Sequence, residues 1–190
     1  MSAYRLALHH PSGVTPVLVG AGALEAAADE LAAWAAERTL FVVSTPRVLA
    51  LHGAALEPVR AAAARAVTLE VEDGEDAKSL ATAERLWSEM LAAGGKRDSR
   101  VLAFGGGSCG DVAGFAAGCF LRGVELVQVP TTLLAQVDAA IGGKTAVDLP
   151  AAKNAVGLFH HPARVVADTR LLASLPRGEL RSGLVEVVKM

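Results

Sequence analysis

The sequence predicts an α/β fold in which helices flank a parallel sheet. From residue 39 onward, short runs of β-branched and apolar residues alternate with longer segments rich in Ala and Leu at helical spacing. Such alternation is typical of parallel strands connected by crossing helices. Apolar residues make up 52% of the chain and charged residues 20%, a balance that supports a buried core. We therefore expect a folded chain.

The first expected element is a small hairpin at the edge of the sheet. Its strands, 4–9 and 14–19, flank the turn-forming residues Pro11, Ser12 and Gly13, and a helix over 23–36 follows. The later strands are expected at 39–44, 66–71, 100–104 and 125–129, and the later helices at 48–65, 79–93 and 109–121.

After Pro130 the pattern changes to two short runs, 145–147 and 155–159, separated by turn residues, which predicts a loop-rich hairpin that carries function. Pro176 then begins a helix over 177–190. We expect one α/β domain over 1–174 and the start of an α-helical domain over 175–190. The chain stops inside this helix with no Gly, Asn or Pro to end it, so we expect a truncation at a domain boundary.

The charge pattern excludes two classes of partner. The formal net charge is -2 with acids and bases interspersed, so there is no basic surface for nucleic acid and no polybasic membrane patch. The longest apolar stretches are interrupted by Pro, Gly or acids, and the start of the chain is unlike a signal peptide. We expect a soluble cytoplasmic protein.

Cysteine and histidine positions give no metal or redox motif. Cys109 and Cys119 lie ten residues apart on one predicted helix, too far along its axis for a disulfide, so we expect reduced thiols. Four of the five histidines form the adjacent pairs His9-His10 and His160-His161. Because neighbours in a strand point to opposite faces, we expect none of the five to be a metal ligand.

The strongest local motif runs from Gly105 to Asp111, directly after a predicted strand and into a helix. Glycines let a ligand approach the backbone closely, and free amides at a helix start favour a pyrophosphate. The spacing differs from the Gly-x-Gly-x-x-Gly dinucleotide fingerprint. On this motif alone, a tight turn and a nucleotide site are both open.

Two further polar groups follow predicted strands. Asp73, Glu75 and Lys78 could hold ribose hydroxyls, although the local pattern favours a turn with a helix cap and a solvated charge pair. The second group combines hydroxyls, an acid, two lysines and an amide, which suits a phosphate or carboxylate substrate better than a solvated loop. Its members are Thr131, Thr132, Asp138, Lys144, Lys153 and Asn154.

Taken together, these segments resemble the 3-dehydroquinate synthase family of the sugar-phosphate cyclase superfamily. The resemblance rests on DGEDAK, GGGSCGD, LRG, QVPTTLLAQVDAAIGGKTAVDLPAAKN and RSGLVEVVK, in the family's order and spacing over roughly residues 70–190. Residues 1–65 match only in general pattern. The resemblance implies a Rossmann-like NAD-binding domain followed by a mainly helical domain, with the active site in the cleft between them.

The resemblance also implies site residues. NAD would be bound by Asp73, Glu75, Lys78, Gly106, Gly107, Ser108, Cys109, Gly110, Asp111, Thr131, Thr132, Lys144, Lys153, Leu171, Leu172, Ala173 and Ser174. The substrate would be held by Asp138, Lys144, Asn154 and Lys189. Arg122 would reach the phosphate site of a neighbouring subunit in a homodimer, although a surface arginine at a helix end fits equally well. Glu186 would be the first ligand of a divalent metal, zinc or cobalt, whose other ligands lie outside this chain.

Three positions depart from the family pattern. Ser108-Cys109 replaces an aliphatic pair, which is a conservative packing change, and Met190 stands where Tyr is common. Ser44-Thr45-Pro46 replaces a polar stretch that holds the adenosine end of NAD, which puts that contact in doubt.

The implied activity is conversion of the sugar-acid phosphate 3-deoxy-D-arabino-heptulosonate 7-phosphate to 3-dehydroquinate and phosphate, in the shikimate pathway of aromatic amino acid biosynthesis. We expect this chain alone to be inactive. Three alternatives remain: another sugar-phosphate cyclase, a non-catalytic nucleotide-binding or dimerisation module, and a metal-dependent alcohol or glycerol dehydrogenase. The last would not be expected to combine DGE-x-x-K with QVPTTLLAQVD.

Overall fold

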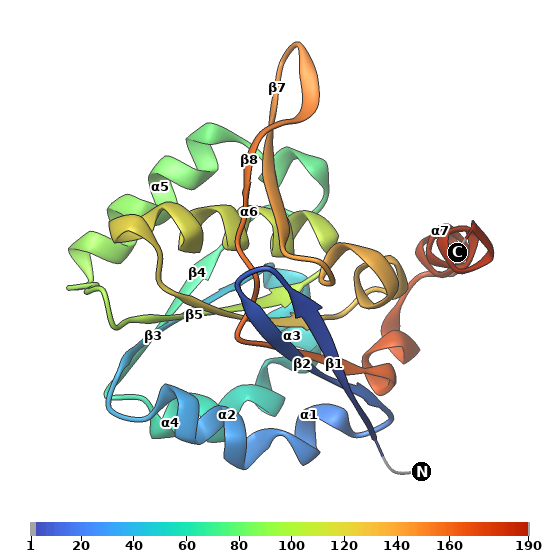
Figure 1. The fold of residues 1–190 in the computed structure, drawn as a ribbon, viewed down its shortest axis with the longest axis horizontal. Helices are drawn as coiled ribbons and strands as arrows, with labels where there is room; N and C mark the ends of the chain where they lie inside the picture. The colour runs from blue at the N-terminus through green and yellow to red at the C-terminus, as the bar shows by residue number, and fades with distance from the viewer. Residues whose placement is uncertain (1–2, 190) are drawn as a thin grey trace.

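The computed structural model describes residues 3–189 (Figure 1) and contains a seven-stranded sheet in the order β1-β2-β9-β6-β5-β3-β4. From β2 to β4 all neighbouring strands run parallel, and only β1 is antiparallel to its neighbour. The expected α/β class and edge hairpin are therefore confirmed. The strands are β1 (Tyr4–His10), β2 (Gly13–Gly20), β3 (Thr39–Ser44), β4 (Arg65–Glu70), β5 (Arg100–Gly105), β6 (Glu125–Pro130) and β9 (Arg164–Asp168).

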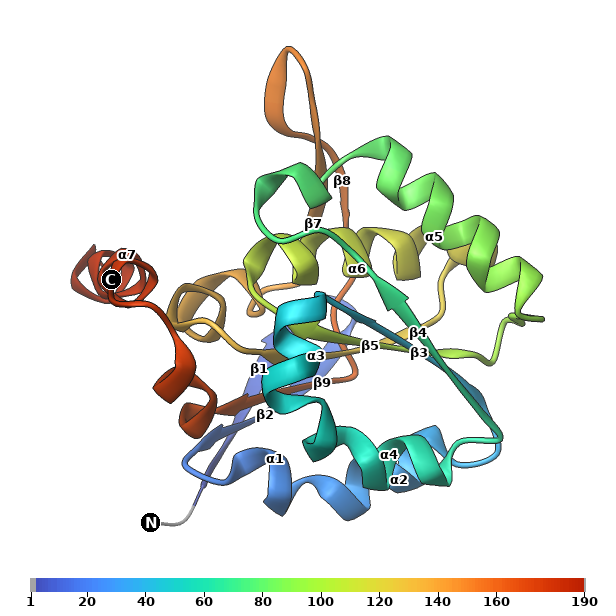
Figure 2. The ribbon, with the colours of Figure 1, turned by 180° about the vertical axis from the view of Figure 1, so that it is seen from behind.

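Helices cover both faces of the sheet (Figure 2), and strand residues alternate between two buried clusters. Phe41 packs with residues of α5 and α6, whereas the adjacent Leu40 packs with residues of α1, α2 and α4. The helices are α1 (Ala23–Ala26), α2 (Ala28–Ala35), α3 (Pro46–His52), α4 (Glu57–Ala62), α5 (Leu80–Ala92), α6 (Gly107–Cys119) and α7 (Arg177–Lys189). No helix within residues 3–189 combines the length and apolar character needed to cross a membrane.

A separate two-stranded hairpin, β7 (Lys144–Leu149) and β8 (Ala152–Phe159), projects past α5 and α6 (Figure 1). It packs on α6 where Gly114 leaves room, because a Cβ at that position would lie only 2.4 Å from Thr145 Cγ2. The hairpin expected after Pro130 is therefore confirmed, with longer strands than predicted.

Several expected boundaries were wrong. The helix predicted over 48–65 is divided into α3, a 3-10 turn at Gly53–Leu56 and α4. Pro58 explains the division, since it cannot donate the backbone hydrogen bond of a helix interior and lies instead at the start of α4. The helix predicted over 23–36 is broken at Ala27, and β9 was not predicted. The last predicted helix is present as α7, and Met190 lies outside the described residues.

Leu102 in β5 tests the core directly because its side chain is fully buried in the cluster beneath α1, α2 and α4. We expect Leu102→Ala to lower the free energy of unfolding by about 2–5 kcal/mol, through lost apolar burial and a residual cavity. Urea denaturation measures this change. The control is Leu91→Ala on α5, where the side chain is 57% exposed and a change within about 0.5 kcal/mol is expected. Equal effects at both positions would contradict the assigned packing.

Candidate functional site

Most of the predicted cofactor residues follow the carboxyl ends of the parallel strands β4, β5, β6 and β9, at one edge of the sheet. The ends of β5 and β6 are tied together, since the Thr131 N–H donates to the Gly105 carbonyl at 2.8 Å. Ligands of open parallel sheets bind at this edge, where connecting segments rather than strands supply the contacts. The geometry therefore makes this edge the candidate site.

The glycine turn forms the start of α6, where the first backbone amides of a helix lack partners within the helix. Gly106 is the N-cap, and among residues 3–189 no side chain caps this helix start. Space favours glycine here, because a Cβ at Gly105 would lie 2.7 Å from the Cys109 Cβ, and one at Gly107 would make a tight contact, 3.3 Å from the Ala139 Cβ. Unpaired N–H groups and the positive end of the helix dipole favour an anionic group such as a pyrophosphate.

Cys109 contributes to this turn from inside the core. Its buried Sγ donates to the Val43 carbonyl at 3.6 Å, and burial raises the pKa of the thiol to about 12, with the charge of Asp73 adding to the effect. The thiol therefore remains protonated and packed against β3. Any contact between this residue and a cofactor is restricted to its backbone amide.

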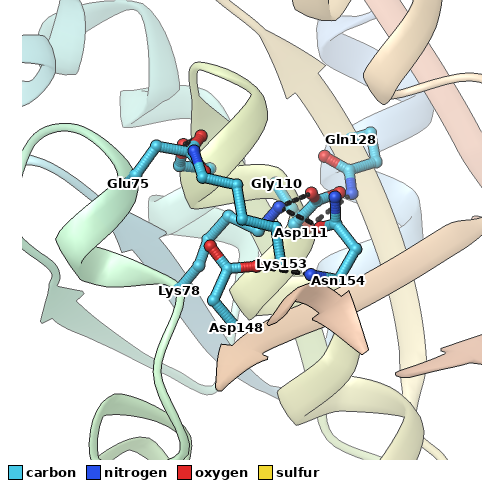
Figure 3. A network of polar contacts seen from close by, with 9 residues as sticks. Glu75, Lys78, Gly110, Asp111, Gln128, Asp148, Lys153 and Asn154 are labelled. Carbon is cyan, nitrogen blue, oxygen red and sulfur yellow. Dashed lines mark hydrogen bonds and ion pairs between the residues drawn. The ribbon is translucent and has the colours of Figure 1, made fainter. Parts of the chain in front are cut away.

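Lys78 is the centre of a polar network that joins three segments (Figure 3). Its side chain is only 5% exposed, and its Nζ lies 2.7 Å from Asp111 Oδ2 and 2.5 Å from Asn154 Oδ1. Burial raises the pKa of Asp111, and the hydrogen bond and charge of Lys78 oppose that rise. The segment before α5, helix α6 and the β7–β8 hairpin are thus held around one buried ammonium.

Further contacts fix the glycine turn within this network. Glu75 accepts a hydrogen bond from Ser108 Oγ at 2.8 Å and lies 3.4 Å from the Lys153 ammonium. The buried Gln128 of β6 donates from Nε2 to the Gly110 carbonyl at 3.0 Å. Gln128 was not among the predicted site residues, although a polar residue inside an apolar strand was a usable signal.

Beside the network lies a cavity of about 470 Å³, which combines carboxylates, an ammonium and an amide with an apolar wall. Three of the four residues predicted to hold the substrate, Asp138, Lys144 and Asn154, line it together. The full lining is Asp111, Asp138, Ala139, Ile141, Lys144, Thr145, Ala146, Asn154, Ala155, Gly157, Leu158 and Phe159. This arrangement can bind a small polar molecule with a negative group on Lys144 and hydroxyls on Asp138.

The other predicted substrate and metal residues lie elsewhere. Arg122, which has a φ of 72°, lines a separate cavity of about 570 Å³ beside His10 and His160. Glu186 and Lys189 pair with each other on α7, with Lys189 Nζ 3.1 Å from Glu186 Oε1. Within the described part of the chain, no group of three His, Cys, Asp or Glu side chains could hold a metal ion.

The remaining predicted cofactor residues follow β4, β6 and β9. Asp73 is exposed before α5, Thr131 is buried after β6, and Thr132 Oγ1 accepts from the Ala135 amide at 3.3 Å. Residues 171–174 form part of a 3-10 helix, Thr169–Ser174, after β9. Ser174 Oγ lies 2.7 Å from His52 Nε2, so this segment meets the end of α3.

The chain is also similar to known proteins in sequence and in fold. A family model described as 3-dehydroquinate synthase N-terminal matches residues 68–182. The 3-dehydroquinate synthase of Pelotomaculum thermopropionicum is 45% identical over 175 residues, covering 92% of this chain and 47% of the relative. The chain therefore spans about half the length of the curated relatives it matches.

Two solved structures share the fold. 2-Deoxy-scyllo-inosose synthase, in complex with carbaglucose-6-phosphate, NAD⁺ and Co²⁺, aligns with a TM-score of 0.88 and 31% identity over 98% of this chain and 50% of its own. The 2-epi-5-epi-valiolone synthase of Streptomyces hygroscopicus subsp. jinggangensis 5008, with NAD⁺ and Zn²⁺ bound, gives a TM-score of 0.82 and 33% identity over 98% of this chain and 51% of its own.

The two thiols should differ in reactivity. At about pH 8, we expect iodoacetamide to modify the exposed Cys119 in the native chain and to leave the buried Cys109 unmodified until urea unfolds it. Mass spectrometry of the native and unfolded chains measures this. Because the pKa of Cys109 is raised from 9.0 to about 12 on folding, its contribution to stability is fully present below 9.0 and is lost as pH rises toward 12. Native modification of Cys109 at the rate of Cys119 would contradict the assigned burial.

Proposed function

Because this chain belongs to the 3-dehydroquinate synthase family, we propose that it is the NAD-binding part of an enzyme that converts 3-deoxy-D-arabino-heptulosonate 7-phosphate to 3-dehydroquinate and phosphate. One observation carries the proposal: an uncapped, glycine-lined helix start adjoins a cavity lined by Asp138, Lys144 and Asn154. Residues 1–174 would form the NAD-binding domain, and residues 175–190 would begin a helical domain that completes the metal and substrate sites.

The glycine turn and its neighbours fit a dinucleotide. The amides of Gly107, Ser108 and Cys109 would donate to the pyrophosphate at the start of α6. The exposed carboxylates of Asp73 and Glu75 would accept hydrogen bonds from ribose hydroxyls. Thr131, Thr132 and residues 171–174, which follow the next two strands of the sheet, would line the remaining length of the site.

When bound, NAD supplies a reversible acceptor for hydride from one substrate carbinol. The residues of this chain would bind the substrate and orient it toward the bound NAD. Lys144 would bind an anionic end, Asp138 would accept hydrogen bonds from hydroxyls, and Asn154 would orient the sugar acid through its amide. The substrate's own phosphate would do much of the proton transfer, guided by these contacts.

The metal site is different, because residues 3–189 do not supply a full ligand set. Glu186 would provide one ligand of a zinc or cobalt ion, and its present partner Lys189 would turn to the substrate. Arg122, which lines a different cavity from Asp138 and Lys144, would reach the phosphate site of a second subunit in a homodimer.

A related sugar-phosphate cyclase is the second candidate. Its support is the TM-score of 0.88 to 2-deoxy-scyllo-inosose synthase over nearly the whole chain. Product analysis with the two sugar phosphates separates these activities. Cofactor binding without turnover, even when the helical domain is supplied, would instead favour a non-catalytic nucleotide-binding module.

Calorimetric titration with NAD tests the cofactor site. We expect one-to-one binding that weakens by about 10- to 150-fold in Glu75→Gln, because a hydrogen bond to a charged group contributes about 1.5–3 kcal/mol. Glu84→Gln, at an exposed acid on α5, is the matched control and should bind like the wild type. An equal loss in both variants, or no binding by a folded wild-type chain, would contradict the assignment.

The incomplete metal set predicts that the purified chain with NAD and Zn²⁺ forms no 3-dehydroquinate. Joining it to the carboxyl-terminal half of the Pelotomaculum thermopropionicum relative should produce activity, which Glu186→Gln should abolish with loss of bound zinc. Chromatographic detection of the product and metal analysis measure both effects. Turnover by the chain alone would refute this part of the proposal.

A further inference from the structure

The β7–β8 hairpin contains an irregularity at the cavity. Val147 pairs with Val156 and Leu149 pairs with Ala152, so the single residue Asp148 lies opposite residues 153–155. Asn154, in the middle of that bulge, has a left-handed φ of 54°. A bulge takes backbone groups out of the ladder, and they need other partners.

Asp148 supplies that partner. Its Oδ1 accepts the Asn154 backbone N–H at 2.6 Å (Figure 3). Its own backbone N–H donates to the Lys78 carbonyl at 2.7 Å, and the Asn154 Oδ1 accepts a hydrogen bond from Lys78 Nζ at 2.5 Å. Asp148, Asn154 and Lys78 therefore form a closed ring of three contacts, and Lys78 is buried against Asp111.

We propose that Asp148 is a positioning residue that sets the conformation of Asn154 and, through it, the polar wall of the substrate cavity. Asn154 lines the cavity, whereas Asp148 is not among its lining residues, so Asp148 acts through its neighbour. The functional consequence rests on the proposed function, in which Asn154 contacts the sugar-acid phosphate. The effect of Asp148 on the conformation of Asn154 does not depend on the proposed function.

The chemistry of the contact gives matched variants. Asp148→Asn retains an acceptor oxygen at the same place, whereas Asp148→Ala removes it and releases Asn154 from its left-handed conformation. Asn154→Gly tolerates that conformation but lacks the amide. Glu84→Ala removes an exposed acid on α5 and is the control for charge.

The test uses NMR of the ¹⁵N-labelled chain and titration with 3-deoxy-D-arabino-heptulosonate 7-phosphate at saturating NAD. In Asp148→Ala, the coupling between the Asn154 amide and α protons should shift toward the value of an extended residue. The Kd for the sugar-acid phosphate should rise about ten-fold, as expected for one lost hydrogen bond that held the site. Asp148→Asn should restore both values, and the Kd for NAD should stay unchanged in both variants.

Three results would overturn the proposal: an unaltered Asn154 coupling in Asp148→Ala, a Kd for NAD that weakens in parallel, or an Asp148→Asn variant that is folded but as impaired as Asp148→Ala. If Asp148→Ala does not fold, the test uses Asn154→Gly and Asp148→Asn. The Kd for the sugar-acid phosphate should rise about ten-fold in Asn154→Gly and should equal the wild-type value in Asp148→Asn. If the wild type binds neither ligand, the proposed function fails, and the Asn154 coupling alone decides whether Asp148 positions it.

Discussion

The buried ammonium of Lys78 is the constraint on which the organisation of the site depends. A charge with 5% exposure is costly unless an opposite charge and further hydrogen bonds surround it. Asp111 and Asn154 supply these from α6 and from the β7–β8 hairpin. Removing either partner would leave the ammonium poorly compensated, so these contacts link three segments that are far apart in the sequence.

This arrangement places two chemical environments next to each other. On one side of Asp111 lies the uncapped start of α6, which suits an anionic cofactor. On the other side, Asp111 lines the cavity with Lys144 and Asp138. The parallel order of the strands makes this possible, because it brings the carboxyl ends of β5 and β6 to one edge of the sheet. The segments that follow these strands can then supply the contacts to a ligand.

Much of the fold could be predicted because buried parallel strands are continuous apolar runs, and those around Phe41 and Leu102 stand out between helical segments. The division of the helix over 48–65 was missed because its apolar spacing continues through Pro58. The glycine turn was also predictable, since consecutive glycines between a strand and a helix indicate a tight backbone turn. The burial of Lys78 was not, because it depends on how a distant hairpin docks, and the local pattern favoured a solvated charge pair.

The most direct test of this account is the ¹⁵N–¹H spectrum of the chain during titration with NAD. Pyrophosphate bound at the start of α6 should move the amide signals of residues 106–109 first and most, with smaller changes at Glu75 and Thr131. The account predicts saturable shifts centred on that turn. Shifts that centre on another surface, such as the cavity beside Arg122 and His10, would contradict it.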